Sequence, residues 1–528
     1  MAGPASLARA LGRIRPAAAD DLTPGCARAV VQENPSRGTD TGTSRSTPWP
    51  GVVAKAQATE TESRPNTLKS ATCTRRMILS GLLALSLAGC AAVPERQNAM
   101  EIAPLPEQFS ASGDQPLPDR WWRHFDSAEL DRLVESALEE NFTLAAARAR
   151  LQRAAALARR AGSNRYPSLE LSGGARRENS RRADAERHWS AGLAAGYEID
   201  LWGRVAADTD AAEMDAGASA AALRSAAISL SAEVADSWMQ WLQARELAAL
   251  LEQQRRVNGQ VLEIVDLRYR NGAASADEVL RQRQLAAQTE AAIVEQASKG
   301  SLLRQRLAVL VGRLPGELQL SEPASAPTAP DLPATGLPAD WLQRRPDLRQ
   351  AWYELAAADA RLASAVAAQY PRFSLSASLA YGAPSLSGLF DNWLAGIAAN
   401  LAVPLLDGGR LRADVDAAAA ARAVAFNDYA QALLEAVAEV EAALEMEQRD
   451  RRLLENLQQR RRRADHIVEQ LRYRYINGSA QYLEVLNALE SQQQVDRALI
   501  QGRWRVLRNR ITLARSLAGG WPQDLEHD

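Results

Sequence analysis

Few residues of this chain are of the types that carry out chemistry. Its 528 residues include three cysteines and four histidines, and none falls in a CxxC pair or another metal-ligand spacing. No glycine-rich phosphate loop, HExxH or GxSxG motif occurs. The sequence therefore predicts neither an enzyme nor a bound metal or other cofactor. The histidines lie far apart and are interpreted as solvated side chains: His124, His188, His466 and His527.

One cysteine, Cys90, stands in a setting that predicts a covalent modification. Arg75 and Arg76 precede an apolar run from Met77 to Leu85, and Leu-Ala-Gly-Cys occupies 87–90. This order is typical of a secretory signal peptide, here at 75–89. The last four residues resemble the bacterial lipobox, in which the cysteine takes a diacylglycerol and an N-acyl group such as palmitate. An ordinary signal peptide with an incidental cysteine is the alternative.

The residues around this signal bear on location. Ala91 follows Cys90, rather than the aspartate of an inner-membrane retention signal, which favours the outer membrane. Residues 1–74 are rich in Ala, Ser, Thr, Pro and Arg without periodicity, and are interpreted as disordered or as an over-extended translation start. No run of 18 or more apolar residues occurs, so no membrane-spanning helix is expected. The net charge is -2, which gives no indication of a nucleic-acid partner.

The chain carries an internal duplication. Four landmarks recur in the same order at a nearly constant distance along the sequence, and the period is too long for a solenoid. Each copy is therefore interpreted as half of a duplicated domain. The pairs are Tyr166-Pro167 and Tyr370-Pro371, Gly203-Arg204 and Gly409-Arg410, Asn271-Gly272 and Asn477-Gly478, and Glu278-Val279-Leu280 and Glu484-Val485-Leu486.

A proline-rich linker separates the two copies. Six prolines fall between Pro315 and Pro338 with Ala, Ser and Thr among them, a composition that favours extended or irregular chain. The predicted division is an extended segment at 90–125, a first repeat at 126–314, the linker at 315–340, a second repeat at 341–520 and a tail at 521–528.

Within each copy the hydrophobic pattern first has a two-residue period. Apolar residues alternate with small or polar ones from Trp189 to Leu201, from Phe373 to Tyr381 and from Trp393 to Leu405. Such alternation is typical of transmembrane barrel strands, which need roughly 9–11 residues. A soluble half-buried hairpin is the alternative. Two strands per copy give four per chain, too few to close a barrel alone, so strands must be pooled between chains.

The rest of each copy is predicted to be helical. Apolar residues recur every three or four positions from about Ala206 to Arg270, enough for a rod of about 97 Å. Asn271-Gly272 ends this rod and reverses the chain, because both residues tolerate positive φ. Gln492, Gln493 and Gln494 are expected to place polar surface on the last helix. A second helix is expected to follow Asn271-Gly272 and to run to about Arg313. The other expected helices run from Ser127 to about Ala161, from about Pro346 to Ala368, from about Arg410 to Ile476, and, as a return helix, to about Leu517.

In this order the elements resemble the TolC-like outer membrane factors, and most closely the lipidated, NodT-type branch that serves RND efflux pumps. The motifs are YEIDLWGR at 197–204, PLLDGGR at 404–410 and GLPADWLQRRPD at 336–347, and the resemblance covers about residues 110–520. It implies a mainly helical, internally duplicated fold with a membrane β-barrel. Three chains would share twelve strands and extend a helical tunnel across the periplasm.

The resemblance also implies a function and its partners. The homotrimer would be the passive outer-membrane exit channel of a tripartite efflux system, anchored to membrane lipid and supplied by a periplasmic adaptor and an inner-membrane RND-type pump. The hairpin turns Asn271, Gly272, Asn477 and Gly478 would form the tips that meet the adaptor. A type I protein secretion duct and a coiled-coil lipoprotein without a channel are the alternatives.

A periplasmic gate is implied near the second turn. The family carries a tyrosine three residues before the turn glycine and acidic residues six and nine after it, which correspond to Tyr475, Glu484 and Asn487. Asn487 is neutral, a departure that leaves three carboxylates in a trimer instead of six and a weaker cation-attracting ring. An ordinary solvated helix charge is the alternative interpretation of Glu484.

Overall fold

The computed structural model describes residues 108–114, 118–178, 186–321, 327–335 and 344–518. All of these lie in one of two units of the chain, Ala92–Asp528; the other unit is Met1–Ala91. The signal peptide, Cys90, residues 1–74 and the tail at 521–528 lie outside the described residues, so the expectations about them stay predictions.

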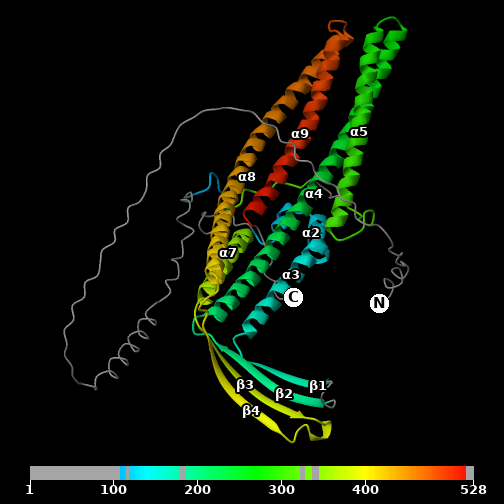
Figure 1. Cartoon of the computed structure of the whole chain (residues 1–528). Helices are drawn as coiled ribbons and strands as arrows, with labels where there is room; N and C mark the ends of the chain where they lie inside the picture. The colour runs from blue at the N-terminus through cyan, green and yellow to red at the C-terminus, as the bar shows by residue number, and fades with distance from the viewer. Residues whose placement is uncertain (1–107, 115–117, 179–185, 322–326, 336–343, 519–528) are drawn as a thin grey trace, which may run out of the picture. The chain divides into compact units, whose positions relative to one another are not determined.

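Two long helical hairpins make up most of the described chain. The first joins α4 (Arg204–Arg270) to α5 (Ala276–Leu310), and the second joins α8 (Arg410–Ile476) to α9 (Tyr482–Ser516). Figure 1 shows both hairpins with their turns at the end away from the sheet. α4 and α8 contain 67 residues each, a length of about 100 Å. The predicted rods and return helices are thus confirmed.

Each hairpin reverses at a glycine in the left-handed conformation. Gly272 has φ 72° and Gly478 has φ 73°, a region that glycine adopts at little cost. The Gly272 N–H donates to the Tyr269 carbonyl at 2.9 Å, and the Gly478 N–H donates to the Tyr475 carbonyl at 3.0 Å. These bonds satisfy carbonyls that the end of a helix leaves unpaired.

An aspartate shortly before each rod accepts hydrogen bonds from backbone N–H groups at the start of the helix. The Asp200 carboxylate accepts the Ala206 N–H at 2.7 Å, while the Asp407 carboxylate accepts the N–H groups of Leu411 and Gly409, each at 2.9 Å. These two backbone hydrogen bonds hold the pKa of Asp407 below its ordinary value. Acidic side chains at these positions satisfy orphan N–H groups at the helix starts.

The helix expected from Ser127 to Ala161 is in fact two helices. α2 (Ala128–Glu140) and α3 (Phe142–Ser163) meet at Asn141, whose side chain accepts the Leu144 N–H at 3.0 Å and donates to the Leu310 carbonyl at 2.9 Å. The break follows from asparagine's strength as an N-cap. The segment expected to be extended at 90–125 also holds a short 3₁₀ helix, η3 (Trp121–Phe125). In the second copy, α7 (Pro346–Ala367) precedes the strands as predicted.

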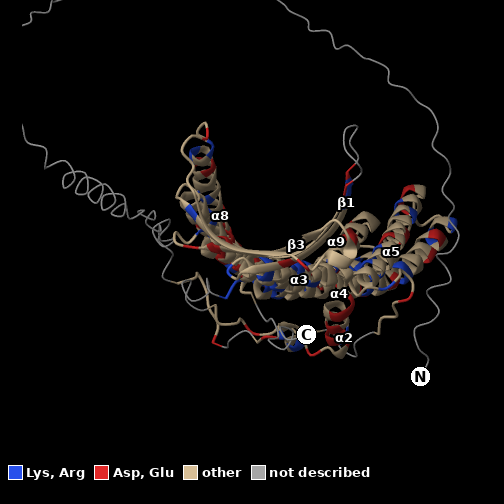
Figure 2. Ribbon diagram, turned by 60° about the horizontal axis from the view of Figure 1, so that its bottom comes forward, with Lys and Arg blue, Asp and Glu red and all other residues tan. Residues whose placement is uncertain are grey.

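Four antiparallel strands form one sheet in the order β1-β2-β3-β4. Figure 2 shows it as a curved surface. Two strands come from each copy, as expected, although β2 begins before Trp189 and β4 ends before Leu405. The strands are β1 (Ser168–Glu178), β2 (Glu186–Ile199), β3 (Arg372–Ala383) and β4 (Trp393–Ala402).

Among the described residues, three apolar cores hold the helices together. The largest joins both copies, because Trp504 of α9 packs with Trp238 and Trp241 of α4. A second core surrounds Val440 of α8, and a third lies toward the turns around Tyr482. The second hairpin is therefore attached to the first at two levels, one by tryptophans and one near the tips.

Candidate gate at the hairpin tips

The four predicted tip residues lie at the turns and are exposed. The Asn271 side-chain amide donates to the Leu267 carbonyl, and that of Asn477 donates to the Tyr473 carbonyl, each at 2.8 Å. A Cβ added at Gly272 or Gly478 would meet no atom within 4 Å. Both glycines are thus required by their backbone angle, and the space beside them is open to another molecule.

Tyr475 links the two hairpins. The Arg268 guanidinium of α4 lies 4.7 Å from the centre of its ring, and the ring of Tyr482 is centred 6.0 Å away. Burial raises the pKa of the Tyr475 hydroxyl, which is buried without a hydrogen-bond partner. Tyr475 therefore acts through packing and a cation–π contact rather than through its hydroxyl.

Glu484 and Asn487 of α9, unlike Tyr475, do not pack against the first hairpin. Both are exposed, whereas Tyr482, Val485 and Leu486 between and beside them are buried. Residues three apart share a helix face, so the carboxylate and the amide lie together on the side that turns away from the first hairpin. The predicted gate residues thus divide into a contact residue, Tyr475, and two residues on a free face.

A buried polar cluster lies farther along the hairpins. Asn258 donates to the Thr289 hydroxyl at 2.9 Å and accepts from the Gln493 amide at 2.7 Å. Gln282 donates to the Asn258 carbonyl at 2.8 Å and accepts from the Tyr482 hydroxyl at 2.6 Å. These side chains are at most 4% exposed, so the cluster is a hydrogen-bonded seam between α4, α5 and α9.

The expectation for this region was wrong at one residue. Gln493 was expected to add polar surface, but only 3% of it is exposed, because Asn258 and Gln254 of the other hairpin supply its partners. The run of three glutamines carried no sign of this. A signal was present in the other copy, since Asn258 and Gln282 interrupt otherwise apolar helix faces there.

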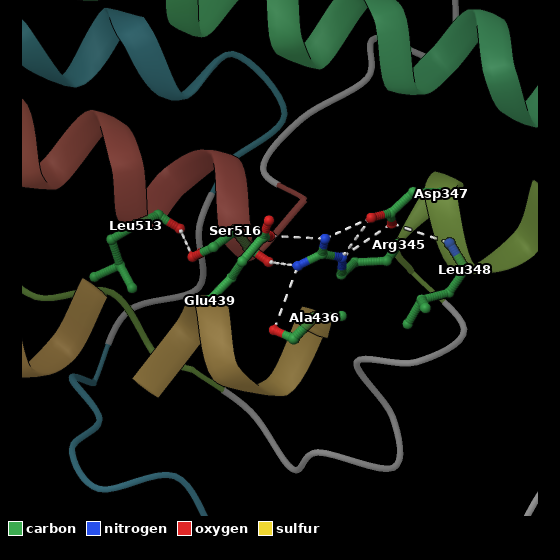
Figure 3. A network of polar contacts seen from close by, with 7 residues as sticks. All are labelled: Arg345, Asp347, Leu348, Ala436, Glu439, Leu513 and Ser516. Atoms are coloured by element: carbon green, nitrogen blue, oxygen red, sulfur yellow. Dashed lines mark hydrogen bonds and ion pairs between the residues drawn. The ribbon is translucent and has the colours of Figure 1, made fainter. Parts of the chain in front are cut away.

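At the opposite end of the second hairpin, Arg345 joins three helices, as Figure 3 shows. Its guanidinium pairs with Asp347 of α7, with Glu439 of α8 at 2.9 Å, and with the Ser516 carbonyl of α9 at 3.1 Å. Burial opposes the charge, but hydrogen bonds to the two carboxylates outweigh it and raise the pKa of Arg345. The base of the hairpin is thereby fixed where the linker enters the second copy.

No metal-binding arrangement lies within the described ranges. No group of three or more His, Cys, Asp or Glu side chains there could hold a metal ion. No helix of the described part of the chain is long and apolar enough to cross a membrane. What the tips offer is exposed charge, an aromatic contact and a turn open to another chain.

Comparisons with known proteins agree with this arrangement. The outer membrane efflux protein family model matches residues 133–313 and 337–519. The chain is 34% identical over 463 residues to the pyoverdine export outer membrane protein OpmQ of Pseudomonas aeruginosa, covering 83% of this chain and 96% of that protein. It is 27% identical to nodulation protein T of Rhizobium leguminosarum, covering 84% and 93% of the two chains.

The fold has solved counterparts. The structure of CusC superimposes with a TM-score of 0.74 at 25% identity, over 82% of this chain and all of that one. The outer-membrane channel OprN gives a TM-score of 0.72 at 26% identity. The chain belongs to the outer membrane efflux protein family and has the TolC-like fold. It is an outer-membrane exit channel of a tripartite efflux system, which confirms the fold, function and location predicted from the sequence.

Proposed function

We propose that three copies of this chain form a passive duct whose periplasmic end is gated by the second hairpin. The observation that carries this is the division on α9: Tyr482 faces the first hairpin, while Glu484 and Asn487 lie on the free face. Three Glu484 carboxylates would form a ring that attracts cations and slows anions. Tyr475 would hold each hairpin in the closed position through Arg268.

The partners follow from the same geometry. The open turns at Gly272 and Gly478 suit the approach of helices from a periplasmic adaptor, which would connect the duct to an inner-membrane RND-type pump. Relatives named for pyoverdine export and for cation efflux support an efflux role over a secretion role. The four-stranded sheet argues against a coiled-coil lipoprotein without a channel.

Two further features complete the proposal. Cys90 would carry the lipid that anchors each chain to the inner leaflet of the outer membrane. The protein would perform no catalysis, because a water-filled tube needs only polar walls while the pump supplies the energy. Substrate choice would then depend mainly on the pump.

A conductance experiment tests the gate. The purified trimer in a planar lipid bilayer should show low conductance that rises several-fold in Tyr475→Ala, because the contact with Arg268 is lost. Glu484→Gln should leave the conductance low and reduce the preference for K⁺ over Cl⁻. Tyr269→Ala is the matched control in the first copy, because Tyr269 is 47% exposed. Equal conductance changes in the two tyrosine variants would rule out a gate on the second hairpin.

A cell-based experiment tests the exit channel itself. A strain that lacks its own outer-membrane component should regain export when this chain is expressed together with its adaptor and pump. Cys90→Ser, with the signal peptide replaced by a non-lipoprotein one, should reduce the amount in the membrane rather than abolish transport. Failure of the unaltered chain to restore export with any adaptor and pump pair encoded beside it counts against the proposed role.

A further inference from the structure

The register of the sheet separates two faces of different character. At one level Leu169, Ala195, Ala377 and Ile397 lie in line across the four strands, and at the next level Glu170, Ala194, Ser378 and Gly396 do. The first set belongs to an apolar face on which Leu169 is 72% and Ile397 87% exposed, as suits contact with lipid. The second set belongs to the opposite face, called here the inner face.

Small uncharged side chains dominate the middle of the inner face, with Leu394 and Asn400 as its larger members. Glu170 is the exception. Along the described strands it carries the only charge on this face between Glu198 at one end and Arg176 at the other. The residues concerned are Ser168, Ser172, Gly174, Ser190, Gly192, Ala194, Gly196, Ser374, Ser376, Ser378, Ala380, Gly382, Gly396 and Ala398.

Nothing on its own strand or the next one neutralises Glu170. Ser168 and Ser172 flank it on the same face, and Ala194 is its cross-strand partner. Glu198 differs in this respect, because the Arg204 guanidinium binds it through two nitrogens at 2.8 and 3.1 Å. The Glu170 carboxylate is instead exposed, so its charge faces the space that the inner face borders.

The free edge of β1 brings no counter-charge either. In a sheet shared by several chains this edge pairs with β4 of a neighbouring copy. The inner-face residues of β4 are all uncharged: Leu394, Gly396, Ala398, Asn400 and Ala402. The carboxylate therefore has no basic partner from either direction among the described strands.

We infer that Glu170 sets a charge preference inside the membrane-embedded part of the duct, favouring cationic over anionic solutes. The inference rests on the proposed trimeric exit channel, in which three Glu170 side chains form a second acidic ring, remote from Glu484. Because the channel wall around them consists mainly of serine, alanine and glycine, these carboxylates are the main local source of electric field inside the barrel.

The size of the effect depends on salt. A carboxylate about 10 Å away in water, screened at 0.01 M salt, raises the local concentration of a monovalent cation about 1.6-fold, and three carboxylates raise it about fourfold. At 1 M salt the screening length is about 3 Å and the effect nearly disappears. Glu170 is thus expected to matter most under dilute external conditions.

Bilayer recordings with Glu170→Gln test the inference. At 0.01 M KCl the three carboxylates enrich K⁺ about fourfold and deplete Cl⁻ about fourfold, so in Glu170→Gln the K⁺ over Cl⁻ permeability ratio should fall about 16-fold, whereas at 1 M KCl it should be unchanged. Glu170→Asp keeps the charge and is the matched control. The recordings are made in a background that combines Tyr475→Ala with Glu484→Gln. In this background neither a closed gate nor the periplasmic ring of Glu484 determines the result. An unchanged ratio at low salt overturns the inference.

Thiol labelling supplies a readout that does not need an open gate. Ser378 lies on the inner face level with Glu170, and in Ser378→Cys the rates of reaction with a cationic and an anionic methanethiosulfonate report the local potential. Adding Glu170→Gln should lower the cationic-to-anionic rate ratio by about threefold at 0.01 M salt, after subtraction of the background measured with Ser378 unaltered. If the unaltered chain restores export but Glu170→Gln changes neither the permeability ratio nor the labelling-rate ratio, the inference about Glu170 alone is refuted. If the unaltered chain does not restore export, the exit-channel proposal is refuted.

Discussion

The two hairpins arose from one repeated unit, yet they are packed very differently. α4 lies against α3, α5, α7 and α9, whereas α8 lies mainly against α7 and α9. Trp238 and Met239 of α4 are fully buried, while α8 exposes Arg460, Arg462 and Arg463. The first hairpin is therefore the scaffold. The second has fewer neighbours to lose when it moves, which suits the part of a gate that opens.

The tips show the same difference at single residues. Each copy has a tyrosine three residues before its turn glycine, Tyr269 and Tyr475, and an arginine just before that tyrosine. Tyr269 is 47% exposed, whereas Tyr475 packs on Arg268 of the other copy. The two tips are thus alike in sequence but differ in contact, and the contact is what supports the proposal that the second copy is the gate.

The largest expected effect comes from cutting the tryptophan attachment between the copies. Trp504 is 2% exposed, packs in the core shared with Trp238, and donates its Nε1–H to Glu246 at 2.6 Å. Trp504→Ala should lower the free energy of unfolding by about 3–5 kcal/mol, measured by denaturant titration of the purified protein. Trp352→Ala, at a residue 48% exposed, should cost less than about 1 kcal/mol. Similar losses in the two variants contradict the assignment of this core as the main attachment.

The polar seam is expected to come next. Asn258→Leu leaves the buried Gln493 amide without its partner, while the Thr289 hydroxyl keeps its bond to the Leu285 carbonyl, and an unpaired buried polar group costs about 1–3 kcal/mol. Because the seam joins the hairpins, single-channel conductance should also rise. Gln260→Leu, at an exposed site on the same helix, should change neither quantity.

A double variant tests whether Asn258 and Gln493 act as one hydrogen-bonded pair. Asn258→Leu combined with Gln493→Leu removes both members of the pair, so its cost should be smaller than the sum of the single costs. Additive losses indicate that the two side chains act independently and that the seam is not one network.

The helices, turns and strands could be predicted from the sequence because each follows from local chemistry. Asn-Gly pairs mark the turns, and alternation over β2 and β3 marks the strands. The break at Asn141 was missed, because the helical period continues through it and only the capping geometry reveals the interruption.

The site was predictable only in part, for a different reason. The positions of Glu484 and Asn487 followed from their spacing to Gly478. The burial of Gln493 and the contact of Tyr475 with Arg268 depend on residues more than 200 positions away. Periodicity within one helix says which face is apolar, but not that a polar face meets another polar face.

A smaller effect is expected at the starts of the two return helices. The Ser275 hydroxyl accepts the Glu278 N–H at 3.3 Å, whereas Gln481 at the matching position caps no helix N–H with its side chain. Ser275→Ala should destabilise the first tip by about 1 kcal/mol, and Gln481→Ser should stabilise the second by up to about that amount. Hydrogen exchange at the two turns measures both, with Gln481→Ala as the neutral control. Equal protection changes of the same sign contradict the assigned difference in capping.

The most limited effect concerns alkaline pH at the contact between the tips. Burial raises the pKa of Tyr475, with Arg268 opposing and Glu278 reinforcing the shift, and the pKa of the neighbouring Tyr482 is raised as well. A raised pKa means that the folded contact favours the neutral phenol. Its contribution is complete below the ordinary tyrosine pKa of about 10 and is lost as the pH rises through the higher folded value.

Spin labels at Ala273→Cys and Ser479→Cys, on the two exposed turns, would measure this loss as a widening of the distance between tips above about pH 10. Tyr475→Phe cannot ionise and loses no hydrogen bond, because the hydroxyl has no partner, so it should keep the distance unchanged up to the pH at which Tyr482 ionises. Tyr269→Phe should behave like the unaltered protein. If Tyr475→Phe widens at the same pH as the unaltered protein, the alkaline opening belongs to Tyr482 and its bond to Gln282, and the seam rather than the cation–π contact holds the second hairpin closed.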